Sequence, residues 1–271
     1  MRRFSFHKGH GTQNDFIILD DSYGMHDMHP EFIKTMCDRR SGIGADGVIR
    51  VVRASSVREW TGEPSVWFMD YYNADGTTAE MCGNGLRVFA RHLINEQLVD
   101  TGSFDVATRA GLKHVDVARH GLIRTDVGAA TLVDEAVTVG LGEREWPAVK
   151  VDVGNPHAVV FVDDGELADL DLTRQPGWAP QDAYPNGVNV EFVHVDGPGK
   201  LSMRVHERGV GETKSCGTGV VAAAAAYRAR TGFDSTIEVT VPGGELAVDF
   251  DGDDACLTGP AVIIGRGEFW L

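Results

Sequence analysis

Two short segments of this 271-residue chain carry residues suited to proton transfer: "MCGNG" at 81–85 and "SCGTG" at 215–219. In each, a cysteine is followed by Gly-x-Gly and then by a run with helical character. A helix N-terminus carries partial positive charge and unpaired backbone N–H groups, which favour a thiolate and bind anions such as carboxylates. Each segment alone therefore predicts an anion pocket with a reactive thiol, Cys82 in one and Cys216 in the other.

The two segments belong to an internal repeat. The cysteines are 134 residues apart (216 − 82), close to half of the chain, and residues 73–85 align with residues 207–219 without a gap. Further upstream, "NDFIILDD" (14–21) resembles "NPHAVVFVDD" (155–164), each with an Asn that opens an apolar strand ending in two Asp. A duplicated plan of this kind predicts a single pocket with one thiol on each face.

Such a pocket suits the inversion of an amino-acid α-carbon. One cysteine, as thiolate, removes the α-proton from one side, and the other, as thiol, returns a proton on the opposite side. Backbone N–H groups at both helix starts stabilise the charge that builds on the substrate carboxylate. The chemistry demands no metal and no cofactor. A redox disulfide is an open alternative, although the pair lacks C-x-x-C spacing, and we expect Cys37 and Cys256, without the glycine context, to be buried packing residues.

Composition is that of a globular protein. Hydrophobic residues make up 42% and charged residues 24% of the chain, and the formal net charge is −15. The acidic balance argues against nucleic-acid binding, which usually needs a basic face. No stretch has the roughly 20 apolar residues that span a bilayer, and the N-terminus lacks the apolar core of a signal peptide. With four widely spread cysteines, we expect a soluble cytoplasmic protein with free thiols.

The elements that must position the two cysteines are strands and one long helix per half. Helical spacing begins at Leu86 in the first half, and in the second half "VVAAAAAYRART" is apolar almost all round, with Gly232 as its C-cap. We expect this alanine-rich helix to be buried inside a curved sheet. The stretches "LKHVDVARHG" and "IEVTVPGGELAVDFDGD" predict hairpins. The fold class is therefore α+β, with two pseudo-symmetric halves that meet near 125–130.

Two other motifs do not define sites. "GIGADG" at 42–47 matches G-x-G-x-x-G, but a helix at 30–40 precedes it and the strand "VIRVVR" follows it, the reverse of a dinucleotide site. "HDMH" at 26–29 has two histidines without further ligands at convincing spacing for a metal.

The whole ordered set of motifs resembles diaminopimelate epimerases, which are pyridoxal-independent isomerases: "HGTQNDF", "GIGADG", "YNADG", "MCGNG.R", "GNPH", "VNVEF", "ERGVGET..CGTG" and "VPGG". The resemblance implies two similar domains, each a β-sheet or barrel around a central helix, with the active site in the cleft between them. It places the first domain at 1–126, with a strand at about 264–271 returning to it, and the second at 127–263. It also implies a homodimer.

The resemblance also implies the roles of individual residues. Cys82 and Cys216 match the acid–base pair, while His157 and Glu207 match residues that tune the thiols. The substrate-binding positions are Asn14, Gly47, Asn73, Gly83, Asn84, Asn155, Asn189, Glu207, Arg208, Gly217 and Thr218. Gly47 stands where some relatives have a Gln side chain, so that any contact there comes from backbone or water.

The implied activity is stereoinversion of LL- to meso-2,6-diaminopimelate, a step of amino-acid biosynthesis that feeds lysine and peptidoglycan, with no cofactor, metal, nucleic acid or membrane partner. Three rival functions are a proline or hydroxyproline racemase, a related isomerase with a carboxylate base, and a non-catalytic binding protein. The Glu207–Arg208 pair argues against the first, because proline has no distal amino-acid group, and the paired cysteines argue against the second and third.

Overall fold

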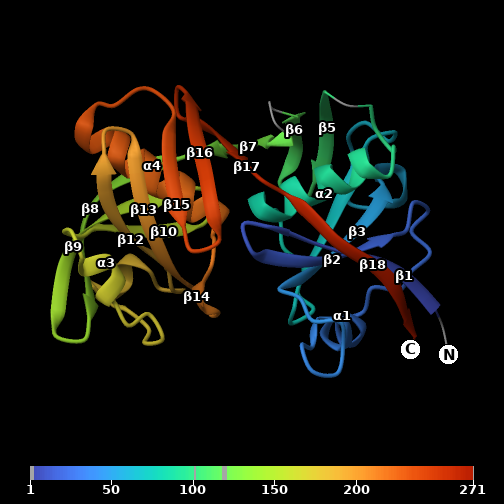
Figure 1. The fold of residues 1–271 in the computed structure, drawn as a ribbon, viewed down its shortest axis with the longest axis horizontal. Helices are drawn as coiled ribbons and strands as arrows, with labels where there is room; N and C mark the ends of the chain where they lie inside the picture. The colour runs from blue at the N-terminus through green and yellow to red at the C-terminus, as the bar shows by residue number, and fades with distance from the viewer. Residues whose placement is uncertain (1–2, 101, 118–120, 271) are drawn as a thin grey trace. The chain divides into compact units, whose positions relative to one another are not determined.

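Strands dominate the computed structural model, in which residues 3–100, 102–117 and 121–270 are described (Figure 1). The chain divides into two compact units, one formed by Met1–Thr125 with Gly259–Leu271 and the other by Asp126–Thr258. The chain passes from the first unit to the second within β7 and returns at the end of β17, so each crossing lies in a strand.

In the described residues of the first unit, strands combine with the α-helices α1 and α2 and the short 3-10 helix η1. Its elements are β1 (Arg3–Gly11), β2 (Asn14–Asp20), α1 (Pro30–Cys37), β3 (Gly47–Arg53), η1 (Ala54–Ser56), β4 (Trp67–Asn73), α2 (Gly83–Asn95), β5 (Ser103–Thr108), β6 (Gly111–Val117), β7 (Ile123–Ala129) and β18 (Val262–Trp270).

The second unit is built in the same way. Its elements are β8 (Thr131–Leu141), β9 (Arg144–Asp152), β10 (Pro156–Phe161), α3 (Glu166–Asp169), β11 (Gly177–Ala179), η3 (Gln181–Ala183), β12 (Asn189–Gly197), β13 (Lys200–Glu207), β14 (Gly211–Thr213), α4 (Gly217–Thr231), β15 (Ile237–Val241), β16 (Gly244–Asp251) and β17 (Asp254–Gly259).

Strand pairing confirms the internal repeat. In the first unit β1 pairs antiparallel with β2, β2 parallel with β3, β3 antiparallel with β4, β4 parallel with β5, and β5 antiparallel with β6. In the second unit β9, β10, β12, β13, β15 and β16 follow the same alternation. The two stretches that open with Asn become the equivalent strands β2 and β10. Because each cysteine follows an equivalent strand, β4 or β13, the fold delivers both to the same local position.

The core of the first unit has a layer on each face of its sheet. Along β2, Phe16 and Ile18 pack with α2, whereas Ile17 and Leu19 pack with α1. Successive side chains of a strand point to opposite faces, so a strand covered on both faces reads as a continuous apolar run. This is why 16–19 contain only large apolar residues.

The helix α4 is enclosed by strands, as its composition predicts. Its residues from Val220 to Tyr227 are at most 4% exposed, and it contacts β8, β9, β10, β12, β13, β15 and β16 (Figure 1). Alanine side chains let those strands approach the helix axis on all sides. Gly232 ends the helix in the left-handed conformation (φ 72°), and its N–H donates to the Arg228 carbonyl, which confirms the predicted C-cap.

Local structure differs from the sequence interpretation at a few element ends. The helix expected over 30–40 ends at Cys37, because Asp38 is extended and its carboxylate accepts hydrogen bonds from the N–H groups of Arg40 and Ser41. In "LKHVDVARHG", β6 reaches Val117 and pairs antiparallel with β7, while 118–120 lie outside the described residues. The segment "IEVTVPGGELAVDFDGD" forms the predicted hairpin of β15 and β16.

Strand β18 pairs antiparallel with β1 along nearly its whole length, from Arg3 opposite Trp270 to His10 opposite Val262. The C-terminal segment thus returns to the first unit, as the resemblance implies. Among the helices of the described residues, none combines the length and the apolar character needed to cross a bilayer.

Candidate active site

Cys82 is the N-cap of α2. Its backbone is extended (φ −141°, ψ 116°), and its Sγ accepts a hydrogen bond from the Gly85 N–H at 3.4 Å. The thiol therefore occupies the position where the backbone N–H groups of a helix have no carbonyl partner. It is half-buried, while Gly83 and Asn84 behind it are buried. This geometry favours negative charge on the sulfur.

Asn14 and Asn84 surround this thiol with amides. Asn14 Oδ1 lies 3.8 Å from Cys82 Sγ and accepts a hydrogen bond from Asn84 Nδ2 at 3.2 Å. On its other side Asn14 Nδ2 donates to Asp46 at 2.8 Å. The structure thus brings two of the sequence-predicted binding residues to the thiol and links them to a carboxylate of the segment "GIGADG".

Arg87 is a cation that the sequence reasoning missed. It lies one turn into α2, has no exposed surface, and donates to Asn84 Oδ1 at 2.7 Å and to the Gly83 carbonyl at 3.3 Å. Within the described part of the chain no carboxylate lies within ion-pair distance of its guanidinium. Burial lowers the pKa of Arg87 to about 10, and the nearby Cys82 thiolate acts in the opposite direction. The attraction is mutual, so Arg87 stabilises the thiolate.

Gly47 and Asn73 lie at the same end of the first sheet as Asn14. The register places Gly47 opposite both Phe16 on β2 and Asn73 on β4. Asn73 Nδ2 donates to Thr77 Oγ1 at 3.0 Å. Gly47 is buried, and a Cβ there would meet the Tyr72 carbonyl oxygen at 2.5 Å. The position therefore accommodates only glycine in this chain, and a side chain cannot point from it.

Cys216 is the N-cap of α4 and is the structural counterpart of Cys82. Its surroundings differ. The thiol is 7% exposed, and Thr218 Oγ1 lies 3.5 Å from Sγ. Burial, followed by the charges of Glu207 and Glu191, raises the pKa of Cys216 well above that of an ordinary thiol. The local environment therefore favours the protonated form.

Glu191 is the second functional residue that the sequence reasoning missed. It is fully buried on β12, and its Oε1 accepts a hydrogen bond from, or shares one with, His157 Nδ1 at 2.7 Å. The first turn of α4 packs directly on it, since a Cβ at Gly219 would lie 2.6 Å from Glu191 Oε1. The last residue of Cys-Gly-x-Gly, Gly219, is thus glycine here because a carboxylate fills the space.

His157 connects this carboxylate to a predicted binding residue. The imidazole is fully buried, and its Nε2 lies 3.0 Å from Asn155 Oδ1. The tuning role expected for His157 can act on the Cys216 thiol through two carboxyl groups. His157 pairs with Glu191, and its charge lowers the pKa of Glu207.

Glu207 ends β13 and carries a raised pKa. Burial is the largest cause, opposed by the hydrogen bond that Thr213 Oγ1 donates to Glu207 Oε1. Next to it, Arg208 is exposed, and its backbone N–H donates to Asn189 Oδ1 at 2.9 Å. Pairing of β12 with β13 brings Asn189 and Glu207 to the same strand ends. A carboxyl, a guanidinium and two amides therefore gather near the start of α4.

Each unit holds one coherent set of the predicted residues. The first set, around the N-terminus of α2, contains Asn14, Gly47, Asn73, Cys82, Gly83 and Asn84. The second set, around the N-terminus of α4, contains Asn155, His157, Asn189, Glu207, Arg208, Cys216, Gly217 and Thr218.

The two remaining cysteines are packed in the interior. Burial raises the pKa of Cys37 to about 11, and Cys256 lies on β17 with its Sγ 3.2 Å from Asp126. Of the histidines in "HDMH", His29 caps α1 by accepting from the Phe32 N–H at 3.1 Å.

Solved structures of epimerase-like proteins share this fold. A phenazine biosynthesis protein of the PhzF family from Bacillus anthracis superimposes with a TM-score of 0.72 over 100% of both chains, at 17% identity. A hydroxyproline epimerase from Agrobacterium vitis gives a TM-score of 0.69 at 15% identity, covering 98% of this chain and 92% of that one. At these identities the likeness concerns the fold, which is the two-domain fold of PhzF-like and proline racemase-like proteins.

Closer relatives are found by sequence. The family model for diaminopimelate epimerase matches residues 6–133 and 149–264. A diaminopimelate epimerase from Streptomyces coelicolor is 49% identical, over 99% of this chain and 97% of the relative, and one from Corynebacterium glutamicum is 48% identical, over 97% of each. The chain belongs to the diaminopimelate epimerase family.

Proposed function

We propose that this chain interconverts LL- and meso-2,6-diaminopimelate, with one of Cys82 and Cys216 removing the α-proton as thiolate and the other supplying a new proton as thiol. The observation that carries the proposal is the placement of both cysteines as N-caps of equivalent helices in a duplicated fold, in a member of this family. A substrate α-carbon held between two such thiols loses its proton to one and receives a proton from the other.

The helix starts supply the anion binding that this reaction needs. Backbone N–H groups at Gly83–Asn84 and at Gly217–Thr218, where the two helices begin, hold the carboxylate of the reacting centre. As the proton leaves, negative charge moves onto that carboxylate, and each preorganised donor contributes about 3 kcal/mol to its stabilisation. No cofactor takes part in these steps.

The distal amino-acid group distinguishes diaminopimelate from a simple amino acid. We assign its recognition to the amides Asn73, Asn155 and Asn189 and to the Glu207–Arg208 pair. Arg208 is exposed, with one hydrogen bond from its guanidinium to the Asn186 carbonyl, so it can grip a carboxylate with two parallel bonds. Asn14 contacts the substrate beside Cys82, and Gly47 contributes backbone only.

The resting protonation states follow from the local charges. Arg87 supports a thiolate at Cys82, whereas Glu191 and Glu207 keep Cys216 protonated. Cys82 is then the base in the resting enzyme and Cys216 the acid, and one turnover leaves the opposite state. We further propose that the enzyme acts in the cytoplasm as a homodimer, without a nucleic-acid or membrane partner, in lysine and peptidoglycan precursor synthesis.

The proposal is tested by solvent exchange. Reduced protein is incubated with LL-diaminopimelate in D₂O, and the α-proton signal is followed by NMR beside Cys82→Ala, Cys216→Ala and a proline sample. We expect loss of the signal with diaminopimelate only, and only in the unmodified protein. Exchange with proline would keep the mechanism and overturn the substrate, and no exchange with either under reducing conditions would overturn the catalytic function.

A further inference from the structure

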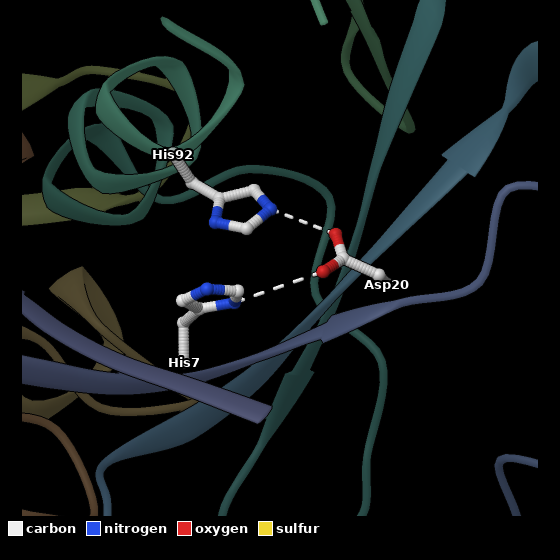
Figure 2. A group of neighbouring side chains, drawn as sticks. All are labelled: His7, Asp20 and His92. Carbon is white, nitrogen blue, oxygen red and sulfur yellow. Dashed lines mark hydrogen bonds and ion pairs between the residues drawn. The ribbon is translucent and has the colours of Figure 1, made fainter. Parts of the chain in front are cut away.

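Three side chains that the proposed reaction does not use meet at the far end of α2. His7 on β1, Asp20 at the end of β2 and His92 on α2 place their donor atoms within 4.8 Å of one another (Figure 2). His92 is ten residues after Cys82, which corresponds to about 15 Å along a helix. The cluster is thus separate from the thiol at the start of α2.

The imidazoles of His7 and His92 each face a different oxygen of the Asp20 carboxylate. His92 Nε2 lies 2.7 Å from Asp20 Oδ1, and His7 Nδ1 lies 3.7 Å from Asp20 Oδ2 (Figure 2). Donor atoms that share a tetrahedral zinc ion with bonds of about 2.0–2.1 Å lie roughly 3.3 Å apart. The two N···O separations lie below and above that value, and all three donors lie within 4.8 Å of one another, close enough to share one cation after side-chain adjustment.

The other ring nitrogen of His7 contacts a second carboxylate, that of Glu96. His7 Nε2 lies 3.4 Å from Glu96 Oε1, so the ring is held by a carboxylate on the side away from Asp20. Metal-binding histidines commonly hydrogen-bond through the other ring nitrogen to a carboxylate, which fixes the tautomer and the ring orientation. Here that support leaves Nδ1 to face the cluster.

Without a cation the cluster leaves a polar atom unsatisfied. His7 Nδ1 is buried and has no hydrogen-bond partner within the described residues, since 3.7 Å to Asp20 is too long. Such atoms are uncommon in folded proteins. A cation bound to His7 Nδ1 uses the lone pair of that nitrogen. It does not satisfy His92 Nδ1, which is also buried without a hydrogen-bond partner in the described residues.

We propose that His7, Asp20 and His92 form a binding site for a zinc-class divalent cation. Two imidazole nitrogens with a carboxylate are ligands that zinc prefers, and water completes the coordination. Asp20 is 43% exposed and provides the entry path, while His92 is fully buried. The cation ties β1, β2 and α2 together and stabilises the first unit, without taking part in proton transfer.

The experiment uses the untagged full chain carrying both Cys82→Ala and Cys216→Ala, so that the reactive thiols bind no zinc. After chelation and dialysis, Zn²⁺ is titrated by calorimetry, and thermal unfolding is followed with and without zinc. We expect one equivalent to bind, and Tm to rise by roughly 5 °C at zinc concentrations about 100 times Kd.

Single variants of the chain that carries Cys82→Ala and Cys216→Ala test which side chains bind the cation. His7→Ala and Asp20→Asn are each expected to weaken binding by about 100-fold, and the second conserves side-chain size if the first disturbs folding. His114→Ala is the matched control, because this exposed histidine contacts the carboxylates of Asp105 and Asp116 and lies outside the His7–Asp20–His92 cluster. Absence of binding in the chain with Cys82→Ala and Cys216→Ala, unchanged binding in both ligand variants, or equal loss in the control would overturn the proposal.

Discussion

The starts of α2 and α4 are equivalent in the fold and opposite in charge. Cys82 has the buried guanidinium of Arg87 one turn behind it, whereas Cys216 has the carboxyl groups of the buried Glu191 and the partly buried Glu207. Duplication of the strand pattern gave both cysteines the same N-cap position. The residues packed behind each helix then set different proton affinities, so a symmetric scaffold can hold one thiolate and one thiol.

The largest effect is expected from removing the cation beside Cys82. Arg87→Met keeps much of the side-chain volume but leaves the thiolate without its counter-ion, so the pKa of Cys82 rises. We expect kcat to fall by about 100-fold, which corresponds to about 2.7 kcal/mol, and the acidic limb of the pH–rate profile to move to higher pH. Steady-state kinetics over a pH series measures both.

Two variants sharpen this result. Arg87→Lys retains the charge and is expected to restore the acidic limb while recovering only part of kcat. Arg91→Met removes a second arginine of α2, which hydrogen-bonds to the Ala261 carbonyl at 3.2 Å, and is expected to leave the profile in place. An equal shift in Arg91→Met would mean that general loss of charge or stability, and not the counter-ion, explains the change.

The last glycine of each Cys-Gly-x-Gly tests the difference in packing. A Cβ at Gly219 meets Glu191 Oε1 at 2.6 Å, but one at Gly85 meets its nearest atoms at 3.4 Å. Gly219→Ala is therefore expected to lower the free energy of unfolding by about 1–3 kcal/mol. Gly85→Ala is expected to leave it unchanged or raise it by up to about 1 kcal/mol, since alanine favours helix.

Denaturant unfolding of both variants measures these differences. Equal stability of the two variants would show that the Glu191 side chain can move away from α4 at no cost. The close packing of Glu191 on α4 would then no longer support its effect on the pKa of Cys216.

Glu191→Gln removes the negative charge and keeps the shape next to Cys216. Glu191 raises the pKa of Cys216, so the variant lowers it. With Cys216 as the acid, activity is lost as pH rises through its pKa, and the alkaline limb is expected to move to lower pH. A pH–rate profile with a fixed alkaline limb and a displaced acidic limb would reverse the assignment of acid and base.

The smallest expected effect concerns acid stability of the first unit alone. Burial by itself raises the pKa of Asp15, but hydrogen bonds from Arg39 and Lys8 outweigh it and bring the pKa to about 2. A carboxylate with a depressed pKa contributes stability above its unfolded pKa, near 3.9, and loses it as pH falls toward 2.

Arg39→Met is therefore expected to lower the free energy of unfolding near neutral pH by about 1 kcal/mol or less, with the difference from the parent vanishing below about pH 2. Denaturant unfolding between pH 7 and pH 2 measures it. A difference that persists in acid would assign the loss to packing of the Arg39 stem.

Much of this arrangement could be predicted from the sequence, because the chemistry sits in local patterns. Cys-Gly-x-Gly marked both helix starts, and the apolar run before Gly232 indicated a buried helix with its C-cap. Arg87 and Glu191 could not be assigned in the same way. Each is a charged residue inside an apolar run, and its burial and partners depend on contacts with distant segments: Arg87 with Thr12 and Pro260, and Glu191 with His157. The His7–Asp20–His92 cluster joins three elements for the same reason.

The protonation states of the two cysteines test the account most directly. The reduced protein is labelled at the cysteine Cβ with ¹³C, and the signals, assigned with Cys82→Ser and Cys216→Ser, are followed by NMR across the pH range in which the fold is stable. The account predicts a thiolate signal for Cys82 at neutral pH and a thiol signal for Cys216 that persists to alkaline pH. A thiolate at Cys216, or two signals that titrate together near an ordinary thiol pKa, would contradict it.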